Sequence, residues 1–529
     1  MSYRSNFSNQ ISMDDSFEQL SDRKKKVVLK SWAKGFADVV FPAINSDAFK
    51  VLYKDSPASR PATPANYVIG ALLIKEMFGL TDDETVEMIQ CDVRAQYALH
   101  STSLQEQPVS DRTFSRFRER LYNYERETGE DLLKEEMQNL SEIFCKYLGI
   151  NKKLKRMDSL MVSTHAKAMS RLEIIYTTVS KCVKLLKNNR REELIPENMK
   201  HYLEEDDLNE VIYYAKDEDV KPRLQKVINE AVEMEQIMNS DEWFDSSEYQ
   251  LLIRVLKEQS EDGKPKDKKD VKSNSLQNPN DPDATYRRKA GKDHKGYVGN
   301  IIESVGHDGS SQITDFDYQE NKHSDQEFSR EYIEKNSDEV MIADGAYGSV
   351  ELQELAEMKN IKLVTTSLTG KEPDTVFAEY TLNEEGTEVI SCAQGYQPIS
   401  NTYYEKTEII RMKMGLHNCE QCPLREHCHV SVQKKAAVVI LSKKMVLRAR
   451  YLKNLGSEEY KKLTRQRNAV EGIMSVLRRR YRVDEIPVFG KERSKIYFYL
   501  KVGAFNVVKL LTHLTKVDEN REMALEYSC

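Results

Sequence analysis

The feature that most constrains the fold is an acidic residue inside an apolar, strand-like segment. Asp158 lies within residues 154–163, where apolar side chains stand on both sides of it. A carboxylate in such a strand is costly to bury unless it is paired or bound to a metal ion. Two more acids stand out: Asp344 follows the strand-like run 340–343, and Glu471 lies on an arginine-rich segment predicted to be one helix over about 457–481. We predict that the fold brings these three carboxylates together.

Three carboxylates on two strands and a packed helix can hold a pair of Mg²⁺ ions, which prefer hard oxygen ligands. Such a pair activates the attacking oxygen and stabilises the leaving oxygen in phosphodiester chemistry. Simpler interpretations exist for two of the acids. Asp344, next to Gly345, could be only a turn former or a helix cap. Glu471 could be only the i, i+4 ion-pair partner of Arg467.

The distribution of charge along the chain indicates a polyanionic partner, although the net charge of the chain is negative. The net charge of the chain is −7, yet residues 461–501 carry twelve Lys and Arg against four Asp and Glu. A DNA backbone would neutralise such a cluster. A second arginine stripe follows Ser110 on a predicted helix, which is either a helix-turn-helix-like DNA reader or a plain bundle helix with a solvated face. The predicted DNA contacts are Arg112, Arg116, Arg120, Arg467, Arg478, Arg479, Arg480 and Arg482.

The order of predicted elements indicates an α/β fold with a helical N-terminal domain. We expect a disordered tail at 1–20, a helical DNA-binding domain at 21–150 and a catalytic domain at 151–515. The catalytic domain would contain an acidic helical insert at 166–260, a flexible linker at 261–295 and a cysteine-bearing insert at 370–455. Without the inserts the order is β-β-β-α-β-α-β-α, which is typical of the RNase H-like (retroviral-integrase-like) mixed sheet.

Three of the eight cysteines are clustered as Cys419-x2-Cys422-x5-Cys428. This spacing is that of a zinc knuckle. Cys392, or one of His417, His427 and His429, could supply a fourth ligand. The alternative is a loop with three reduced cysteines.

Together these pieces resemble the DDE transposases of bacterial insertion sequences. The resemblance is carried by Arg-Met-Asp158-Ser, by Ala-Asp344-Gly-Ala-Tyr-Gly-Ser and by Arg467-x3-Glu471-x6-Arg478, where the family often has Lys at the last place. The N-terminal segments 80–84 and 111–121 and the segment 280–284 also resemble this family. Similar transposases carry such a cysteine cluster in the insert before the helix with the catalytic Glu.

The resemblance implies the catalytic triad Asp158, Asp344 and Glu471, with two Mg²⁺ ions or Mn²⁺ in their place. It implies double-stranded DNA as the partner, namely transposon ends and target, and a homodimer on paired ends. The expected reactions are cleavage at the element's ends and strand transfer. The alternatives are a transposase-derived DNA-binding protein without catalysis and an RNase H-like nuclease without strand transfer.

The sequence contains no run of 18 or more apolar residues, so we expect no membrane span. The first residues lack the apolar core of a secretory signal. We therefore expect a cytoplasmic protein associated with the nucleoid.

Overall fold

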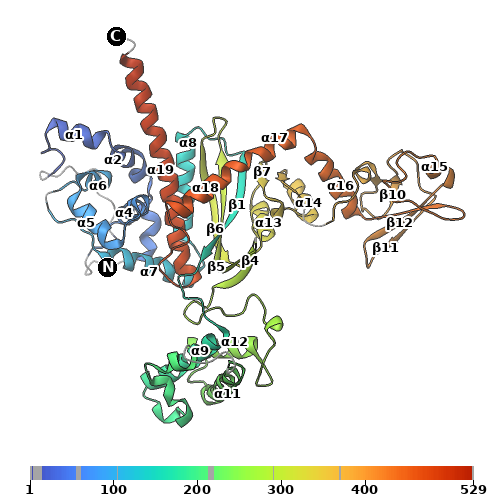
Figure 1. The fold of residues 1–529 in the computed structure, drawn as a ribbon. Coiled ribbons are helices and arrows are strands. Elements are labelled where there is room, and N and C mark those ends of the chain that lie inside the picture. The colour runs from blue at the N-terminus through green and yellow to red at the C-terminus, as the bar shows by residue number, and fades with distance from the viewer. Residues whose placement is uncertain are drawn as a thin grey trace.

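A central mixed β-sheet organises the molecule in this computed structural model, which describes residues 3, 15–54, 61–103, 105–212, 220–289, 291–367 and 371–526. Helices of the N-terminal region lie on one side of the sheet, and a cysteine-bearing region extends on the other (Figure 1). A separate helical region, which contains residues 171–259, lies below the sheet in the same view. The mixed α/β class and the helical N-terminal region expected from the sequence are thereby confirmed.

The N-terminal region is helical because its apolar residues recur at helical spacing between clear capping signals. Thr81 and Glu84 form the predicted capping box of α5, and Gly79 ends α4 in a left-handed conformation. Phe114, Phe117 and Leu121 form the buried face of α7, as their spacing predicts. The elements are α1 (Asp22–Leu29), α2 (Trp32–Gly35), η1 (Phe36–Val40), α3 (Phe41–Ala43), η2 (Ser46–Leu52), α4 (Ala65–Phe78), α5 (Asp82–Cys91), α6 (Val93–Ala98), α7 (Asp111–Thr128) and α8 (Leu132–Tyr147).

The end of the expected disordered tail is ordered. Residues 15–20 form a turn, and the buried ring of Phe17 packs against Tyr97 with 4.6 Å between ring centroids. Most of the preceding residues lie outside the described part of the chain. The N-terminal region therefore starts earlier than the polar composition of this segment suggests.

The central sheet places β1 between an antiparallel half and a parallel half. Its strand order is β4-β5-β1-β7-β8, and β6 pairs with β5. The β1–β5 and β5–β6 pairs are antiparallel, whereas the β1–β7 and β7–β8 pairs are parallel. The strands are β1 (Leu154–Ser163), β4 (Thr285–Lys289), β5 (Lys292–Val305), β6 (Ser311–Glu320), β7 (Val340–Ala343) and β8 (Lys362–Thr365).

Both faces of the sheet are covered by apolar packing. On one face, Phe316 and Tyr318 of β6 pack with Phe498 and Tyr499 of the long C-terminal helix α19 (Lys491–Glu526). The other face packs against α13 (Asp325–Lys335) and α14 (Val350–Met358). Gly299 of β5 allows the close approach of α19, because a Cβ there would lie 2.6 Å from the ring of Phe498.

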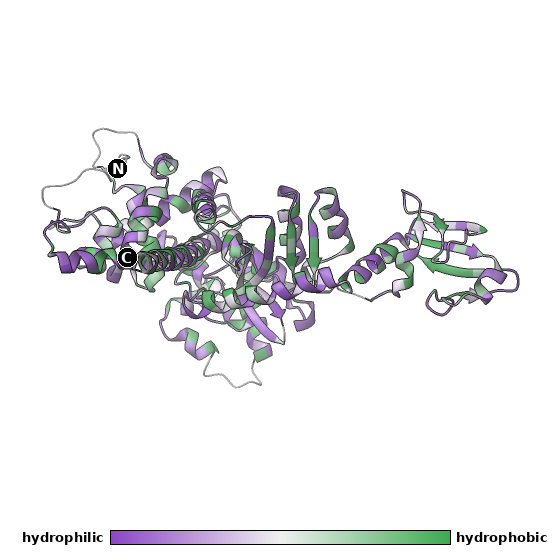
Figure 2. Ribbon diagram, turned by 90° about the horizontal axis from the view of Figure 1, so that it is seen from above, coloured by the Kyte–Doolittle hydropathy of each residue, from purple (hydrophilic) through white to green (hydrophobic). Residues whose placement is uncertain are grey.

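Two smaller units are inserted into the chain and have their own cores. In Figure 2 the cysteine-bearing unit stands apart at the right, with hydrophobic residues in its strands. The helical insert contains α9 (Arg171–Asn188), η3 (Glu192–Leu194), η4 (Glu197–Leu203), α10 (Asp207–Ile212), α11 (Val220–Met238) and α12 (Ser247–Gln259). The cysteine-bearing region contains η8 (Thr375–Glu379), β9 (Thr381–Leu382), β10 (Val389–Ser391), β11 (Ser400–Tyr404), β12 (Ile409–Met414), α15 (Leu416–Glu420), β13 (Ser431–Val432) and β14 (Ala437–Leu441).

Two predicted elements differ from the structure. The linker predicted at 261–295 is largely structured: it contains β2 (Ser260–Glu261) with β3 (Lys264–Pro265), η6 (Lys268–Asp270), β4 and the start of β5. Asp281 anchors it, because its fully buried carboxylate accepts hydrogen bonds from Thr164, Tyr297 and the backbone amide of Gly490. The predicted helix at 457–481 is two helices, α17 (Glu458–Gln466) and α18 (Asn468–Arg479), which follow α16 (Lys443–Leu455).

Candidate functional site

Asp158 lies in the middle of β1, opposite Ile301 of β5. Its side chain is mostly buried, and one carboxylate oxygen accepts a hydrogen bond of 2.8 Å from the backbone amide of Ser159. Burial raises the pKa of the Asp158 carboxyl above its usual value, although Arg467 and Lys289 act in the opposite direction. The charged form of the buried Asp158 carboxyl is therefore stabilised by the two nearby cations.

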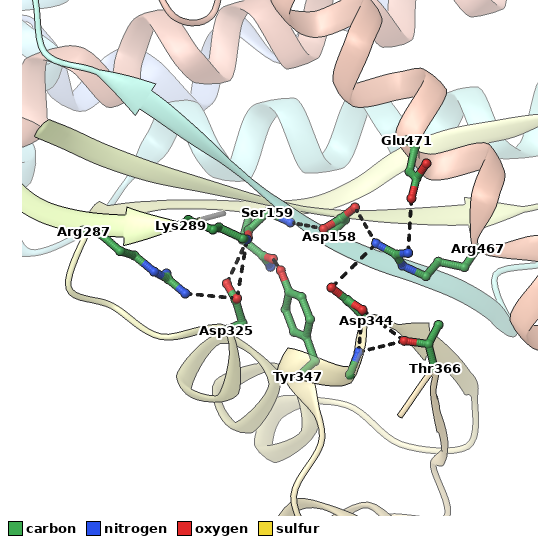
Figure 3. A network of polar contacts seen from close by, with 12 residues as sticks. Asp158, Ser159, Arg287, Lys289, Asp325, Asp344, Tyr347, Thr366, Arg467 and Glu471 are labelled. Atoms are coloured by element: carbon green, nitrogen blue, oxygen red, sulfur yellow. Dashed lines mark hydrogen bonds and ion pairs between the residues drawn. The ribbon is translucent and has the colours of Figure 1, made fainter. Parts of the chain in front are cut away.

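Asp344 follows the last residue of β7, the strand next to β1 in the sheet. Its carboxylate accepts hydrogen bonds from the Gly345 amide at 2.7 Å and from Thr366 Oγ1 at 3.0 Å. A Cβ at position 345 would lie 2.1 Å from Ser367 Oγ, so any larger residue there would force Ser367 to move. The turn former expected from the sequence is thus present, and it aims the carboxylate toward β1 (Figure 3).

Arg467, at the junction of α17 and α18, brings the third acid to the other two. Its Nη1 lies 3.2 Å from Glu471 Oε1, while its Nη2 lies 3.5 Å from Asp158 Oδ2 and 3.9 Å from Asp344 Oδ2. Figure 3 shows the guanidinium between the three carboxylates. The predicted Arg467–Glu471 pair therefore exists, but it is one part of a larger cluster that joins two strands and a helix.

Arg156, two residues before Asp158, fixes the start of α18 relative to the sheet. Its guanidinium forms a buried ion pair with Glu303 of β5, with 2.7 Å between Nη2 and Oε2. Its Nη1 also donates a hydrogen bond of 2.9 Å to the backbone carbonyl of Gln466. The residue before Arg467 is thus tied to the strand that carries Asp158.

The donor set of this cluster fits divalent cations in its chemistry, since carboxylate oxygens are the ligands that Mg²⁺ prefers. The three carboxylates already surround one positive group. However, among the residues that the structure describes, no group of three His, Cys, Asp or Glu side chains is arranged to hold a metal ion. Glu471 is largely exposed and reaches the other acids only through Arg467.

A second polar cluster, which the sequence analysis missed, adjoins Asp158 (Figure 3). It consists of Ser159 on β1, Asp325 on α13, and Arg287 and Lys289 on β4. The sequence held a partial signal, because residues 287–289 are three consecutive cations, and a strand there would place Arg287 and Lys289 on one face. The prediction of a flexible linker over this segment concealed it.

The predicted DNA-contacting arginines fall into two groups besides Arg467. Arg112 and Arg116 of α7 are exposed, whereas the Arg120 guanidinium stacks over the ring of Tyr53 at 4.7 Å. At the end of α18 and just beyond it, Arg478, Arg479, Arg480 and Arg482 are all exposed. Two of them have acidic neighbours: Arg478 lies 3.6 Å from Asp484, and Arg482 lies 3.8 Å from Glu485.

The cysteines of the predicted knuckle lie together. Cys392, Cys419, Cys422 and Cys428 line one small cavity in the cysteine-bearing region. Burial raises the pKa of the Cys419 and Cys428 thiols. Of the histidines considered as ligands, His427 instead pairs with Asp374 at 2.7 Å. These sulfurs do not form a metal-binding group within the described residues, as noted above.

Comparison with known families gives two matches. A family described as "Transposase DDE domain" matches residues 391–511, and one described as "Transposase domain (DUF772)" matches residues 19–120. The first range includes Glu471 and the cysteines, but not Asp158 or Asp344. Comparisons with curated proteins and with solved structures found no match. No helix in the described part of the chain has the length and apolar character needed to span a membrane.

Proposed function

The chain belongs to the DDE transposases, and from this premise we propose that it binds the ends of an insertion sequence and cuts and joins DNA there. We assign catalysis to Asp158, Asp344 and Glu471. One observation carries this assignment: carboxylates from β1, from the end of β7 and from α18 all lie within 4 Å of one guanidinium. Residues more than a hundred positions apart in the chain thus share a single cation.

The strand order supports an RNase H-like core for the proposed catalytic domain at 151–515. Three antiparallel strands, β6, β5 and β1, continue into the parallel strands β7 and β8. With the inserts set aside, these strands and α13, α14 and α18 follow the order expected from the sequence. In this arrangement the carboxyl end of β7 and the centre of β1 face the same helix.

Divalent cations, when bound, supply an activated oxygen nucleophile and stabilise the leaving oxygen of the phosphodiester. Neighbouring residues orient the carboxylates that would hold these cations. The Ser159 amide orients Asp158, and the Gly345 amide and Thr366 orient Asp344. Arg467 lowers the repulsion among the three acids while they are close together.

Arg467 is held in a way that allows it to be displaced. Two of its ion pairs are 3.5 Å and 3.9 Å long, and its Nε is buried without a hydrogen-bond partner. Asp158, Asp344 and Glu471 would hold a divalent cation through the carboxylates that now face Arg467, so its contacts with them would weaken. The released guanidinium can then bind a DNA phosphate, which agrees with the DNA-binding role expected from the sequence.

The test is cleavage and joining of a labelled duplex that carries the terminal sequences flanking the gene, with Mg²⁺ or Mn²⁺. Asp158→Asn, Asp344→Asn and Glu471→Gln should each abolish both steps while DNA binding persists. The matched control is Glu485→Gln, which removes an exposed carboxylate just beyond α18 and should leave both steps intact. Binding without cleavage by the wild type would favour the DNA-binding alternative. Cleavage without joining would favour the nuclease alternative.

We also propose that the cysteine-bearing region binds a structural zinc ion through Cys392, Cys419, Cys422 and Cys428, whose side chains would have to close around the ion from the positions they occupy in this structure. The support is their common cavity and the knuckle spacing of three of them. Metal analysis of the purified protein should find about one zinc per chain, and Cys419→Ser should lower it. Cys91→Ser is the control, because Cys91 is exposed on α5. A zinc-free wild type with well-folded 371–441 would contradict the proposal.

One expectation about the assembly follows from joining two DNA ends. We propose that the chain acts as a homodimer on paired ends in the cytoplasm, near the nucleoid. The mass of the complex with end-bearing duplexes, measured by light scattering, should correspond to two chains and two duplexes. A complex of one chain with one duplex under cleavage conditions would contradict it.

A further inference from the structure

Strand β4 presents a charged face toward the candidate site. Arg287 and Lys289 lie two residues apart and therefore on the same face of the strand. Arg288, between them, points to the other side, where it is largely exposed and lies 3.7 Å from Asp293. β4 pairs only with β5, so it forms an edge of the sheet in the described structure.

The carboxylate of Asp325 holds both cations of this face. Asp325 is almost fully buried at the start of α13, and its Oδ2 lies 3.1 Å from Arg287 Nη2 and 3.7 Å from Lys289 Nζ. Its Oδ1 accepts a hydrogen bond of 2.9 Å from Ser159 Oγ. A single negative charge thus faces two positive charges, which leaves this cluster with a net positive charge.

The two cations are not held equally. The Arg287 guanidinium also donates to the backbone carbonyl of His323, and its side chain is three-quarters buried. Among the described residues, Lys289 forms a long ion pair with Asp325 and a contact of 3.5 Å with Ser159 Oγ, it acts electrostatically on Asp158, and its side chain is 41% exposed. This ion pair is long at 3.7 Å, and solvent reaches its ammonium end, so it holds Lys289 less firmly than the shorter, more buried pair holds Arg287. Arg287 therefore serves as the structural counterion of Asp325, and the Lys289 ammonium is available to another anion.

The position of Lys289 near the proposed catalytic residues indicates which anion it would bind. Ser159 follows Asp158 in β1 and therefore points to the other face of the strand, yet the Lys289 ammonium is near enough to lower the pKa of the Asp158 carboxyl. In Figure 3 it lies on the opposite side of Asp158 from Arg467. A nucleic acid strand placed with one phosphate at those carboxylates carries its next phosphate one nucleotide away. A compact lysine ammonium is suited to such a single phosphate.

We propose that Lys289 binds a backbone phosphate of the DNA strand next to the reacting phosphodiester, with Asp325 and Ser159 as positioning residues. The proposal rests on the proposed DNA-cutting function and deepens it. Arg287 keeps Asp325 neutralised, so Lys289 can leave Asp325 without exposing a buried charge. Ser159 connects this contact to Asp158, since its amide orients the Asp158 carboxylate and its hydroxyl donates to Asp325.

The test measures how DNA binding depends on salt. A fluorescein-labelled duplex with the terminal sequences is titrated with the full chain, with Ca²⁺ replacing Mg²⁺ to prevent cleavage. Loss of one phosphate contact lowers the slope of log affinity against log salt by about 0.9. Between 50 and 200 mM salt, the affinity advantage of the wild type over Lys289→Ala should therefore shrink by roughly 3.5-fold. Lys289→Arg should restore the slope.

Arg288→Ala is the matched control, because it removes the same charge from the opposite face of the same strand. Its slope should equal that of the wild type. Equal slopes for Lys289→Ala and Arg288→Ala, in a chain whose wild type binds and cuts the duplex with Mg²⁺, would overturn this inference alone. A wild type that neither binds nor cuts would instead overturn the proposed function, and this inference with it.

Discussion

Loss of the Arg156 guanidinium should loosen the sheet and misplace Glu471 at the same time. The Arg156 side chain is 7% exposed and that of its partner Glu303 is 0% exposed. Breaking a buried ion pair on one side costs about 3–5 kcal/mol. Lys509 remains 3.3 Å from Glu303 after Arg156→Met, so we expect the lower end of that range, about 3 kcal/mol.

Hydrogen exchange measures this change locally, which suits a chain with several cores. A loss of about 3 kcal/mol corresponds to a roughly 100-fold faster exchange of the β1 and β5 amides, at 1.4 kcal/mol per factor of ten. The double variant Arg156→Met/Glu303→Met removes both partners, and replacement of a buried pair by apolar residues is often close to neutral. It should recover most of the protection in both strands.

DNA cleavage should not recover in the double variant. The carbonyl of Gln466 lacks the Arg156 donor in both variants, so the α17–α18 junction loses its tie to β1. A single variant whose amides exchange less than tenfold faster than those of the wild type would contradict this role of Arg156. So would a double variant that cuts DNA as fast as the wild type.

Three further predictions concern the carboxylate cluster, the N-terminal region and the sheet. Arg467→Gln should tighten Mn²⁺ binding, measured by electron paramagnetic resonance without DNA, because it removes a competing cation; weaker binding would contradict this. Burial raises the pKa of Glu136 to about 7, so its contribution to stability is present below the ordinary Glu range and lost as pH rises through 7. Glu136→Gln should therefore reduce the fall in thermal stability between pH 5 and 8, and an unchanged fall would refute this. Gly299→Ala should destabilise the sheet by about 1–3 kcal/mol in denaturant unfolding through its clash with Phe498, and Phe498→Leu added to it should relieve part of the loss.

Sequence patterns were sufficient to predict the structure where it depends on residues close together in the chain. The capping box at Thr81 and Glu84, the stop at Gly79 and the buried face of α7 depend on residues within one or two turns. The strand that contains Asp158 and the strand that precedes Asp344 were predictable because both are apolar, β-prone runs. The acid within the first run and the acid after the second marked the candidate site. The family resemblance rested on the same short motifs, and the comparisons confirmed it.

Contacts between distant segments decided the rest. Residues 261–295 look like a linker by composition, yet β4 forms because β5 offers it a hydrogen-bonding edge, and the segment is anchored by the buried Asp281. Arg467 appears in the sequence as one more DNA-binding arginine, but the fold places it among carboxylates that lie up to 309 residues away. Lys289 on β4 and Asp325 at the start of α13 lie 36 residues apart in the chain and meet only in the folded protein. The sequence by itself thus singled out the three acids to which we assign catalysis, because charge and local propensity are properties of short segments. Only the tertiary structure decided which of them share a site, because that depends on strand order and on the seating of α18 against β1.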